Sequence, residues 1–353
     1  MDALQEVPDP RKARGQRYSW TFLLAVVCAA LASGQKTPHA IAHWITLHAT
    51  ELRQELTPRR HTMPSEATVR RLLRRIDLQA LETQVTTYNQ QLATEAPAGT
   101  ITTTKGEVLR GQAVDGKELR GLRAHGQPLS LVHLVQHGSG TVLGQNEVSE
   151  KSNEITAVPA LLAGRDLSNT VLTMDALLTQ RELSQHILEQ RGHYLMVVKE
   201  NQPALYQAIA LLFEQPPWLP REKAAEYQVH RTTEKGHGRR ETRVLESSTT
   251  LSAYLDWPGV RQVMRRQRQR VVVKTGEVRT KTTYGITSLP ASDVGAAGLE
   301  VLWRGHWTVE NRTHYVLDVT MGEDACQVHV GQAPQALSIL RKAVLALLRV
   351  HGW

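Results

Sequence analysis

The first 95 residues carry apolar positions at helical spacing. After Ser65, residues Val69, Leu72, Leu73 and Ile76 fall at i, i+3, i+4 and i+7, which predicts an amphipathic helix that begins at this serine. The opposite face of the helix carries Arg70, Arg71, Arg74 and Arg75. This face either lies on DNA, as a helix-turn-helix element does, or is simply solvated.

Three further helices are predicted in this region from their apolar content, over residues 19–33, 38–47 and 78–92. A small, polar, Pro- and Gly-bearing stretch at 93–107 then indicates a linker. We therefore expect an α-helical N-terminal domain over residues 1–100.

Beyond the linker, short apolar runs alternate with helical patterns. The predicted strands cover residues 112–115, 131–136, 142–148, 170–174 and 193–198, and the predicted helices cover 155–163, 180–190 and 203–213. Strands that alternate with helices indicate an α/β layer architecture for residues 101–216.

Residues 217–290 return to β patterning. Alternating and β-branched runs at 226–232, 240–247, 260–264, 270–274 and 279–287 predict a β-rich insertion. Residues 291–353 are then expected to be helical, first from Val294 to about Asn311. The last helix, Gln335 to Val350, is apolar on most faces and is predicted to be buried.

Charge narrows the class of partner. The chain has 42 Lys and Arg against 34 Asp and Glu, a formal net charge of +8. A basic surface suits a polyanion, because each neutralised phosphate releases counterions.

The cysteines and the N-terminus bear on localisation. Cys28 and Cys326 have no paired spacing, which argues against zinc ribbons, redox motifs and a disulfide framework and favours the cytoplasm. One segment imitates a secretory signal: basic residues at 11–17 are followed by an apolar run that ends in Ala30-Leu31-Ala32. The alternative is a buried helix, since the run is too short to span a membrane.

Three acids stand out as candidate chemistry. We expect Asp115 to end the first strand of the α/β region, Asp175 to end a later strand, and Glu310 to sit on a helix. Carboxylates at neighbouring strand ends converge at one edge of a sheet and suit magnesium or manganese. Two such ions can activate a nucleophile and stabilise the leaving oxygen of a phosphodiester. Spacing alone favours ordinary roles, since an Asp at a strand end is more often a turn or cap residue and a Glu on a helix is usually a solvated surface charge.

The motifs resemble those of bacterial insertion-sequence DDE transposases, in the subfamily of H-repeat-associated proteins. The matching runs occur in order along almost the whole chain and include MPSEATVRRLLRRID, AVDGKELRG, EKSNEI, MDALLTQRE, YLMVVKENQP, EKGHGRRETR and HWTVENRTHYVLDVTMGEDA. The resemblance implies an RNase H-like catalytic core with a β-rich insertion and an N-terminal helical domain. It also assigns the catalytic and metal-binding roles to Asp115, Asp175 and Glu310, with two Mg²⁺ or Mn²⁺ ions.

The resemblance extends to neighbouring positions and has departures. It implies that His306, Trp307 and Asn311 line the site. Leu178 stands where the family pattern has a histidine three residues after the second Asp. That departure questions an outer contact of the site, because Asp175 itself is present.

Other polar residues are candidates for contact with DNA. Lys199 and Asn201 follow a predicted buried strand, where they either contact a phosphate or cap the next helix. His237, Arg239 and Arg240 lie in a Gly-flanked turn, where arginines suit phosphate contact or minor-groove insertion and a solvated hairpin tip is the alternative. Arg266, Arg268 and Arg270 are expected on one strand face, either as a phosphate track or as a charged edge.

These observations predict a transposase that binds the terminal inverted repeats of its element and target DNA. It is expected to act as a homodimer or larger synaptic complex, without a membrane. Water would cut the phosphodiester at each element end, and the freed 3′-hydroxyl would attack target DNA. The alternatives are an RNase H-like nuclease without strand transfer and an inactive DNA-binding derivative.

Overall fold

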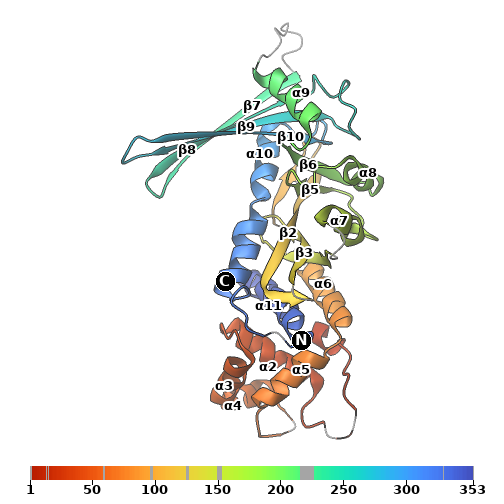
Figure 1. The fold of residues 1–353 in the computed structure, drawn as a ribbon, viewed down its shortest axis with the longest axis vertical. Coiled ribbons are helices and arrows are strands. Elements are labelled where there is room, and N and C mark those ends of the chain that lie inside the picture. Colours follow the sequence, from red (N-terminus) through yellow and green to blue (C-terminus); the bar gives the residue numbers. More distant parts are fainter. Residues whose placement is uncertain are drawn as a thin grey trace.

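The computed structural model describes residues 2–12, 14, 16–58, 60–95, 98–124, 127–148, 153–214, 226–328 and 330–352. Within these ranges the chain forms a ten-stranded sheet with helices packed against it and a helical group at one end (Figure 1). The predicted mixed α/β class is therefore confirmed.

The N-terminal segment forms helices close to the predicted ranges. They are α1 (Asp2–Gln5), α2 (Trp20–Ala32), α3 (Pro38–Leu47), α4 (Ala49–Leu56), α5 (Glu66–Arg75) and α6 (Leu78–Glu95). The segment that imitates a secretory signal forms α2, most of whose side chains are buried. Ser19 begins this helix by accepting a hydrogen bond from the backbone N–H of Phe22. Within the described residues, no helix has both the length and the apolar character that crossing a membrane requires.

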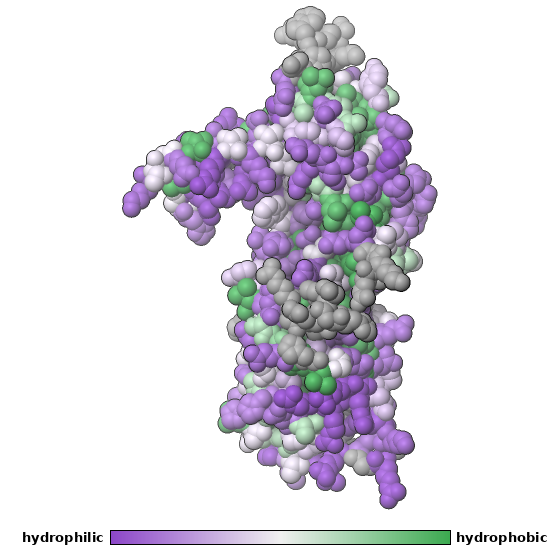
Figure 2. Space-filling model, in the orientation of Figure 1, coloured by the Kyte–Doolittle hydropathy of each residue, from purple (hydrophilic) through white to green (hydrophobic). Residues whose placement is uncertain are grey.

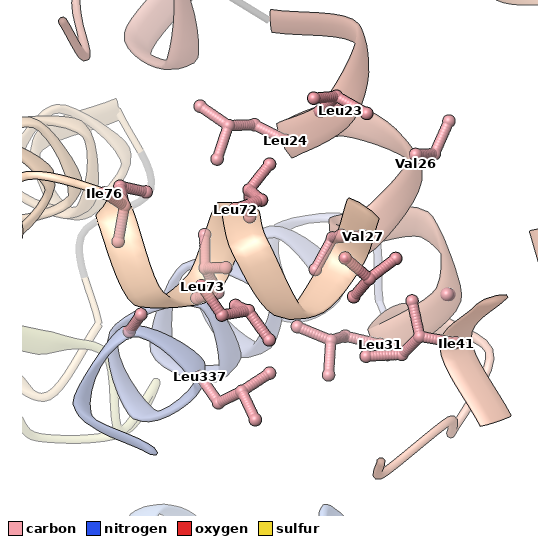
Figure 3. Close-up of a cluster of buried hydrophobic side chains, with 14 of the residues drawn as sticks. Leu23, Leu24, Val26, Val27, Leu31, Ile41, Leu72, Leu73, Ile76 and Leu337 are labelled. Atoms are coloured by element: carbon pink, nitrogen blue, oxygen red, sulfur yellow. The ribbon is translucent and has the colours of Figure 1, made fainter. Parts of the chain in front are cut away.

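One hydrophobic core joins the two ends of the chain. Leu23, Leu24, Leu72 and Leu73 belong to one buried cluster with Leu337 of the last helix, α11 (Ala333–Val350), and Figure 3 shows Leu73 nearest to Leu337. Most side chains of α11 are buried, because α2, α5 and α6 pack against it.

The centre of the molecule is a mixed sheet. Its strands lie in the order β4 (Val142–Glu147), β3 (Gln127–Gln136), β2 (Val108–Ala124), β5 (Thr170–Met174) and β6 (His193–Val198), and the short β1 (Thr100–Thr102) also pairs with β2. The pairs β2–β5 and β5–β6 are parallel, whereas β3 and β4 are antiparallel to their neighbours.

Helices cover both faces of this sheet. Val114 and Leu134 on one face pack with α7 (Glu154–Leu162), α8 (Arg181–Glu189) and α9 (Pro203–Glu214). Ala113 and Val135 point to the other face, which meets α10 (Ala296–Gly305) and the π-helical turns η2 (Val309–His314) and η3 (Val316–Thr320). Successive side chains of a strand alternate between faces, so residues one apart in β2 belong to different layers.

The sheet continues into an arm that projects from the body (Figure 1). Strand β10 (Val278–Thr287) pairs with β6, and β9 (Gln262–Val272), β8 (Arg239–Ser248) and β7 (Tyr227–Gly236) follow in order. The arm is largely hydrophilic in Figure 2. Where α10 no longer covers the arm, the polar side chains on both faces of its strands are partly or fully exposed to solvent.

Two predicted boundaries are wrong. The separate strands at 260–264 and 270–274 are parts of β9, since residues 265–269 keep register with both β8 and β10. The polar side chains of residues 265–269 interrupt the apolar pattern from which a strand is predicted, because the arm has no continuous apolar face. Asp115 also does not end its strand: β2 runs to Ala124, because β3 continues to pair with it after β5 has ended.

Candidate metal centre

Asp115 and Asp175 lie at the same level of the sheet. The parallel pairing of β2 with β5 ends at Val114 opposite Met174, and each aspartate is the next residue of its strand. Although Asp115 is inside β2, it therefore occupies the edge at which the parallel pair stops. This is where carboxylates from neighbouring strands can act together.

The π-helical turn η2 brings Glu310 to the same place. His314, four residues later, has its Nδ1 atom 3.7 Å from Glu310 Oε2 and 3.8 Å from Asp115 Oδ2. Asp115, Glu310 and His314 each offer a ligand atom, and these atoms all lie within 4.8 Å of one another. The sequence analysis did not single out His314, although its i, i+4 spacing from Glu310 was a usable signal.

The electrostatics of the site are those of crowded carboxylates. Burial, followed by the charges of Asp175, Glu154 and Glu310 in that order of effect, raises the pKa of Asp115 to about 7. Burial and Asp175 also raise the pKa of Glu154. Carboxylates whose negative charges lie this close together favour a bound cation, because the cation would relieve their repulsion.

Gly116 makes room for the fourth acid. A Cβ atom built on this glycine would lie 2.0 Å from Glu154 Oε1, so the carboxylate rests against the bare backbone of β2. Glu154 lies in the EKSNEI run, of which residues 150–152 are outside the described residues. Carboxylate oxygens with one imidazole nitrogen form a donor set that fits manganese or magnesium.

His314 is held from behind by a second histidine. His133 Nδ1 lies 3.2 Å from His314 Nε2, and both side chains are buried. Burial lowers the pKa of His314 to about 3, so the imidazole is neutral at ordinary pH. If Nε2 of His314 donates to His133, then Nδ1 presents its lone pair to the two carboxylates, as a metal ligand would.

A buried cation stands beside the acids. Lys117, two residues after Asp115 on β2, has its Nζ 2.7 Å from Asp318 Oδ1 and 2.5 Å from Glu323 Oε2. Burial raises the pKa of Glu323, but Lys117 and Lys342 lower it more, and the result is about 2. Glu323 thus connects β2 with the segment that follows η3.

The backbone around Asp175 fixes this carboxylate. Its Oδ1 accepts hydrogen bonds from the N–H groups of Leu177 at 3.0 Å and Leu178 at 3.2 Å. Leu178 is fully buried in the core that α8 covers. The position at which the family pattern has a histidine therefore packs apolar side chains in this chain.

Lys199 and Asn201 lie near Asp175. Together they line a groove of about 580 Å³, which β10 closes with Lys281 and its neighbours. The side-chain amide of Asn201 donates to the carbonyl of Ala176 at 2.7 Å, so it positions the turn after Asp175. Lys199 is exposed beside the groove.

His306, Trp307 and Asn311 differ in their surroundings. His306 Nδ1 lies 3.1 Å from Thr173 Oγ1, on the strand that leads to Asp175. Burial lowers the pKa of His306, and the charge of Asp175 opposes that change. Trp307 is 50% exposed, and Asn311 is exposed next to Glu310.

The residues predicted in the insertion lie on the arm. His237 and Gly238 form the β7–β8 turn with φ of 50° and 70°, and Arg239 begins the returning strand with Arg240. This turn is at the far end of the arm, away from the acids (Figure 1). The predicted site residues therefore fall into two separate groups, one near the acids and one on the arm.

The predicted arginine track needs a correction. Arg266 is buried and bonds Glu300 of α10 at 2.8 Å, so it stabilises the root of the arm and is not exposed to a phosphate. Arg268 and Arg270 lie 3.4 and 3.7 Å from Glu241 and remain partly exposed. Alternation does place the three on one face, but only the outer two are accessible.

Matches to known proteins cover almost the whole chain. Residues 107–347 match the family model described as a transposase DDE domain, and residues 1–89 match the model of the region associated with it. The chain is 29% identical to "Putative transposase YncI" of Escherichia coli O157:H7, over 99% of this chain and 87% of that protein. It is 31% identical to "H repeat-associated putative transposase YhhI" of Escherichia coli strain K12, over 67% of this chain and 63% of that protein. The cryo-EM structure of the piggyBac transposase synaptic complex with hairpin DNA aligns with 99% of this chain and 70% of that chain, at 11% identity and a TM-score of 0.47.

Proposed function

The chain belongs to the family of insertion-sequence DDE transposases, and we propose that Asp115, Asp175 and Glu310 are its catalytic acids. One observation carries this proposal. Asp115 and Glu310, from distant parts of the chain, place ligand atoms within 4.8 Å of each other and of His314. Asp175 belongs to the same group of acids, since its charge raises the pKa of Asp115.

These residues would hold two divalent ions, Mg²⁺ or Mn²⁺, with His314 as a further ligand. When bound, such ions supply Lewis-acid activation of the attacking oxygen and stabilise the leaving oxygen of a phosphodiester. Glu154 contributes negative charge from the side of α7, and Lys117 holds β2 in place through its buried ion pairs. In this proposal the RNase H-like core predicted from the sequence is the mixed sheet β2–β6.

The reaction proceeds in two displacements at phosphorus. In the first, water forms a P–O bond and the bond to the 3′-oxygen at the element end breaks, with a proton passing to that oxygen. In the second, this 3′-oxygen forms a bond to a target phosphorus and displaces the target's own 3′-oxygen. The enzyme forms no covalent intermediate, so neither step requires a serine or tyrosine nucleophile.

Double-stranded DNA is the proposed substrate, both as terminal inverted repeats and as target. Lys199 borders the groove beside Asp175, where it would neutralise a phosphate near the cut. Arg239 and Arg240 would contact DNA at the tip of the arm. His306, Trp307 and Asn311 would line the DNA near the acids, and two or more copies would hold the paired ends.

Magnesium-dependent cleavage of element-end DNA tests the proposal. Asp175→Asn should reduce cleavage about a thousandfold or more, because several kcal/mol of charge stabilisation is lost. Asp166→Asn is the matched control, because this exposed acid precedes β5, at the end of the strand opposite Asp175, where it binds Arg191 and the backbone N–H of Ser168. Equal cleavage by both variants would reject the assignment of the acids.

The same assay separates the alternatives. Oligonucleotides that carry the element end, mixed with a target plasmid, should give joined products for a transposase. A nuclease of the same fold would cut without joining, and an inactive derivative would bind the ends without metal-dependent cutting.

A further inference from the structure

The N-terminal helical end contains a cavity lined by cations. It has a volume of about 850 Å³ and lies between residues 10–18 and helix α5. Its lining includes Arg11, Lys12, Arg14, Arg17, Arg71 and Arg75, and none of the described residues that line it is Asp or Glu. Helix α5, which lines the cavity, lies at the end of the molecule opposite the arm (Figure 1), and none of the residues of the proposed metal centre lines the cavity.

Most of these cations lack an acidic partner. Arg11 is the exception, since it binds Asp9 at 2.8 Å and places its guanidinium over the ring of Trp20, 5.1 Å from the centroid. For the other five, no ion pair is formed within the part of the chain that the structure describes. Five like charges around one cavity repel one another, and a polyanion would remove that repulsion.

Helix α5 divides its arginines between two surroundings. Arg71 and Arg75, four residues apart, line the cavity. Arg70 and Arg74 lie on the neighbouring face beside Pro38 and Gln327, and Arg70 binds Glu66 at 2.6 Å. The exposed arginine face seen in the sequence thus consists of one pair that borders the cavity and one pair outside it.

One residue that lines the cavity has an unpaired hydrogen-bond donor. Trp20 lines the cavity and is only 6% exposed, yet its indole Nε1 has no acceptor among the residues that the structure describes. An indole N–H can only donate, and leaving it unpaired inside the protein costs free energy. A phosphate oxygen is an acceptor of the required kind.

We propose that this cavity binds the phosphate backbone of duplex DNA, a second DNA contact surface apart from the acids and the arm. The inference rests on the proposed function for the choice of polyanion. Five unpaired cations exceed what a single phosphate ion needs, and they come from two segments that flank one opening. A series of successive phosphates matches that arrangement, and such contacts position DNA without reading its sequence.

Paired double variants of α5 test the inference. Binding of a short random-sequence duplex is measured by fluorescence anisotropy across a range of salt, in EDTA so that the metal centre is silent. Arg71→Ala/Arg75→Ala should lower the slope of log K against log salt by about 1.8 and weaken binding about tenfold. Arg70→Ala/Arg74→Ala removes the same charge from the same helix and should leave the slope unchanged.

A readout at Trp20 is independent of charge. Trp20→Phe keeps the packing and removes the donor, so it should weaken DNA binding severalfold while the thermal unfolding temperature stays within a few degrees of wild type. Equal salt slopes for the two double variants would overturn the inference, as would tighter cavity-dependent binding of a duplex RNA of the same sequence. If Asp175→Asn loses cleavage but keeps the wild-type salt slope of DNA binding, both proposals are upheld. If Asp175→Asn still cleaves DNA, only the assignment of the catalytic acids is rejected.

Discussion

Replacing Lys117 with methionine should destabilise the fold far more than an equivalent change at the surface. The Lys117 side chain is 3% exposed and its ammonium lies between Asp318 and Glu323, the latter 1% exposed. Methionine fills a similar volume but leaves the Glu323 carboxylate without its nearest cation. The loss of one partner from a buried pair costs about 3–5 kcal/mol.

The pKa of Glu323 gives a second route to the magnitude. Burial raises this pKa, Lys117 and Lys342 lower it, and it settles at about 2 against an ordinary 4.5. Each pKa unit is worth about 1.4 kcal/mol, so the charged form contributes about 3 kcal/mol to stability. Because the folded pKa is depressed, this contribution is complete above the unfolded pKa and is lost as the pH falls toward 2. A measurement at pH 7 therefore detects all of it.

Urea unfolding followed by far-UV circular dichroism measures the change. Lys105→Met is the control, because Lys105 binds Asp293 at 2.9 Å with a side chain that is 63% exposed, so its loss should change the free energy of unfolding little. The double variant Lys117→Met/Glu323→Gln should cost less than the sum of its single variants. Similar small losses for Lys117→Met and Lys105→Met would refute the reasoning, as would strict additivity in the double variant.

Three further predictions concern the metal centre. Gly116→Ala should displace the Glu154 carboxylate, because the new Cβ would lie 2.0 Å from it. The variant should bind Mn²⁺ more weakly, as measured by electron paramagnetic resonance, with little change in unfolding temperature. Unchanged Mn²⁺ binding would exclude Glu154 from the site. His314→Gln should lower Mn²⁺ affinity about 10- to 100-fold, because it removes the imidazole 3.8 Å from Asp115, and wild-type affinity would exclude a ligand or orienting role. Thr173→Val should cost about 2–3 kcal/mol in urea unfolding, since its hydroxyl contacts His137 at 2.9 Å and His306 at 3.1 Å, and a neutral effect would show that these imidazoles find other partners.

Local sequence patterns predicted much of the secondary structure. The strand Thr170–Met174 and the helix Pro38–Leu47 have the predicted bounds, because both are short apolar runs with clear polar or Pro-marked ends. The arm was harder to predict. Residues 265–269 of β9 are polar inside a strand, and only their pairing with β8 and β10 explains why they are extended.

The candidate site divides in the same way. The sequence by itself determined the residue types, the strand before Asp175 and, through the motifs, the family. Only the tertiary structure decided that Asp115 lies within a long strand, that His314 and Glu154 join the acids, and that Arg266 is buried against Glu300. These facts depend on contacts between segments far apart in the chain, such as the 195 residues from Asp115 to Glu310, and periodicity along a single segment carries no information about them.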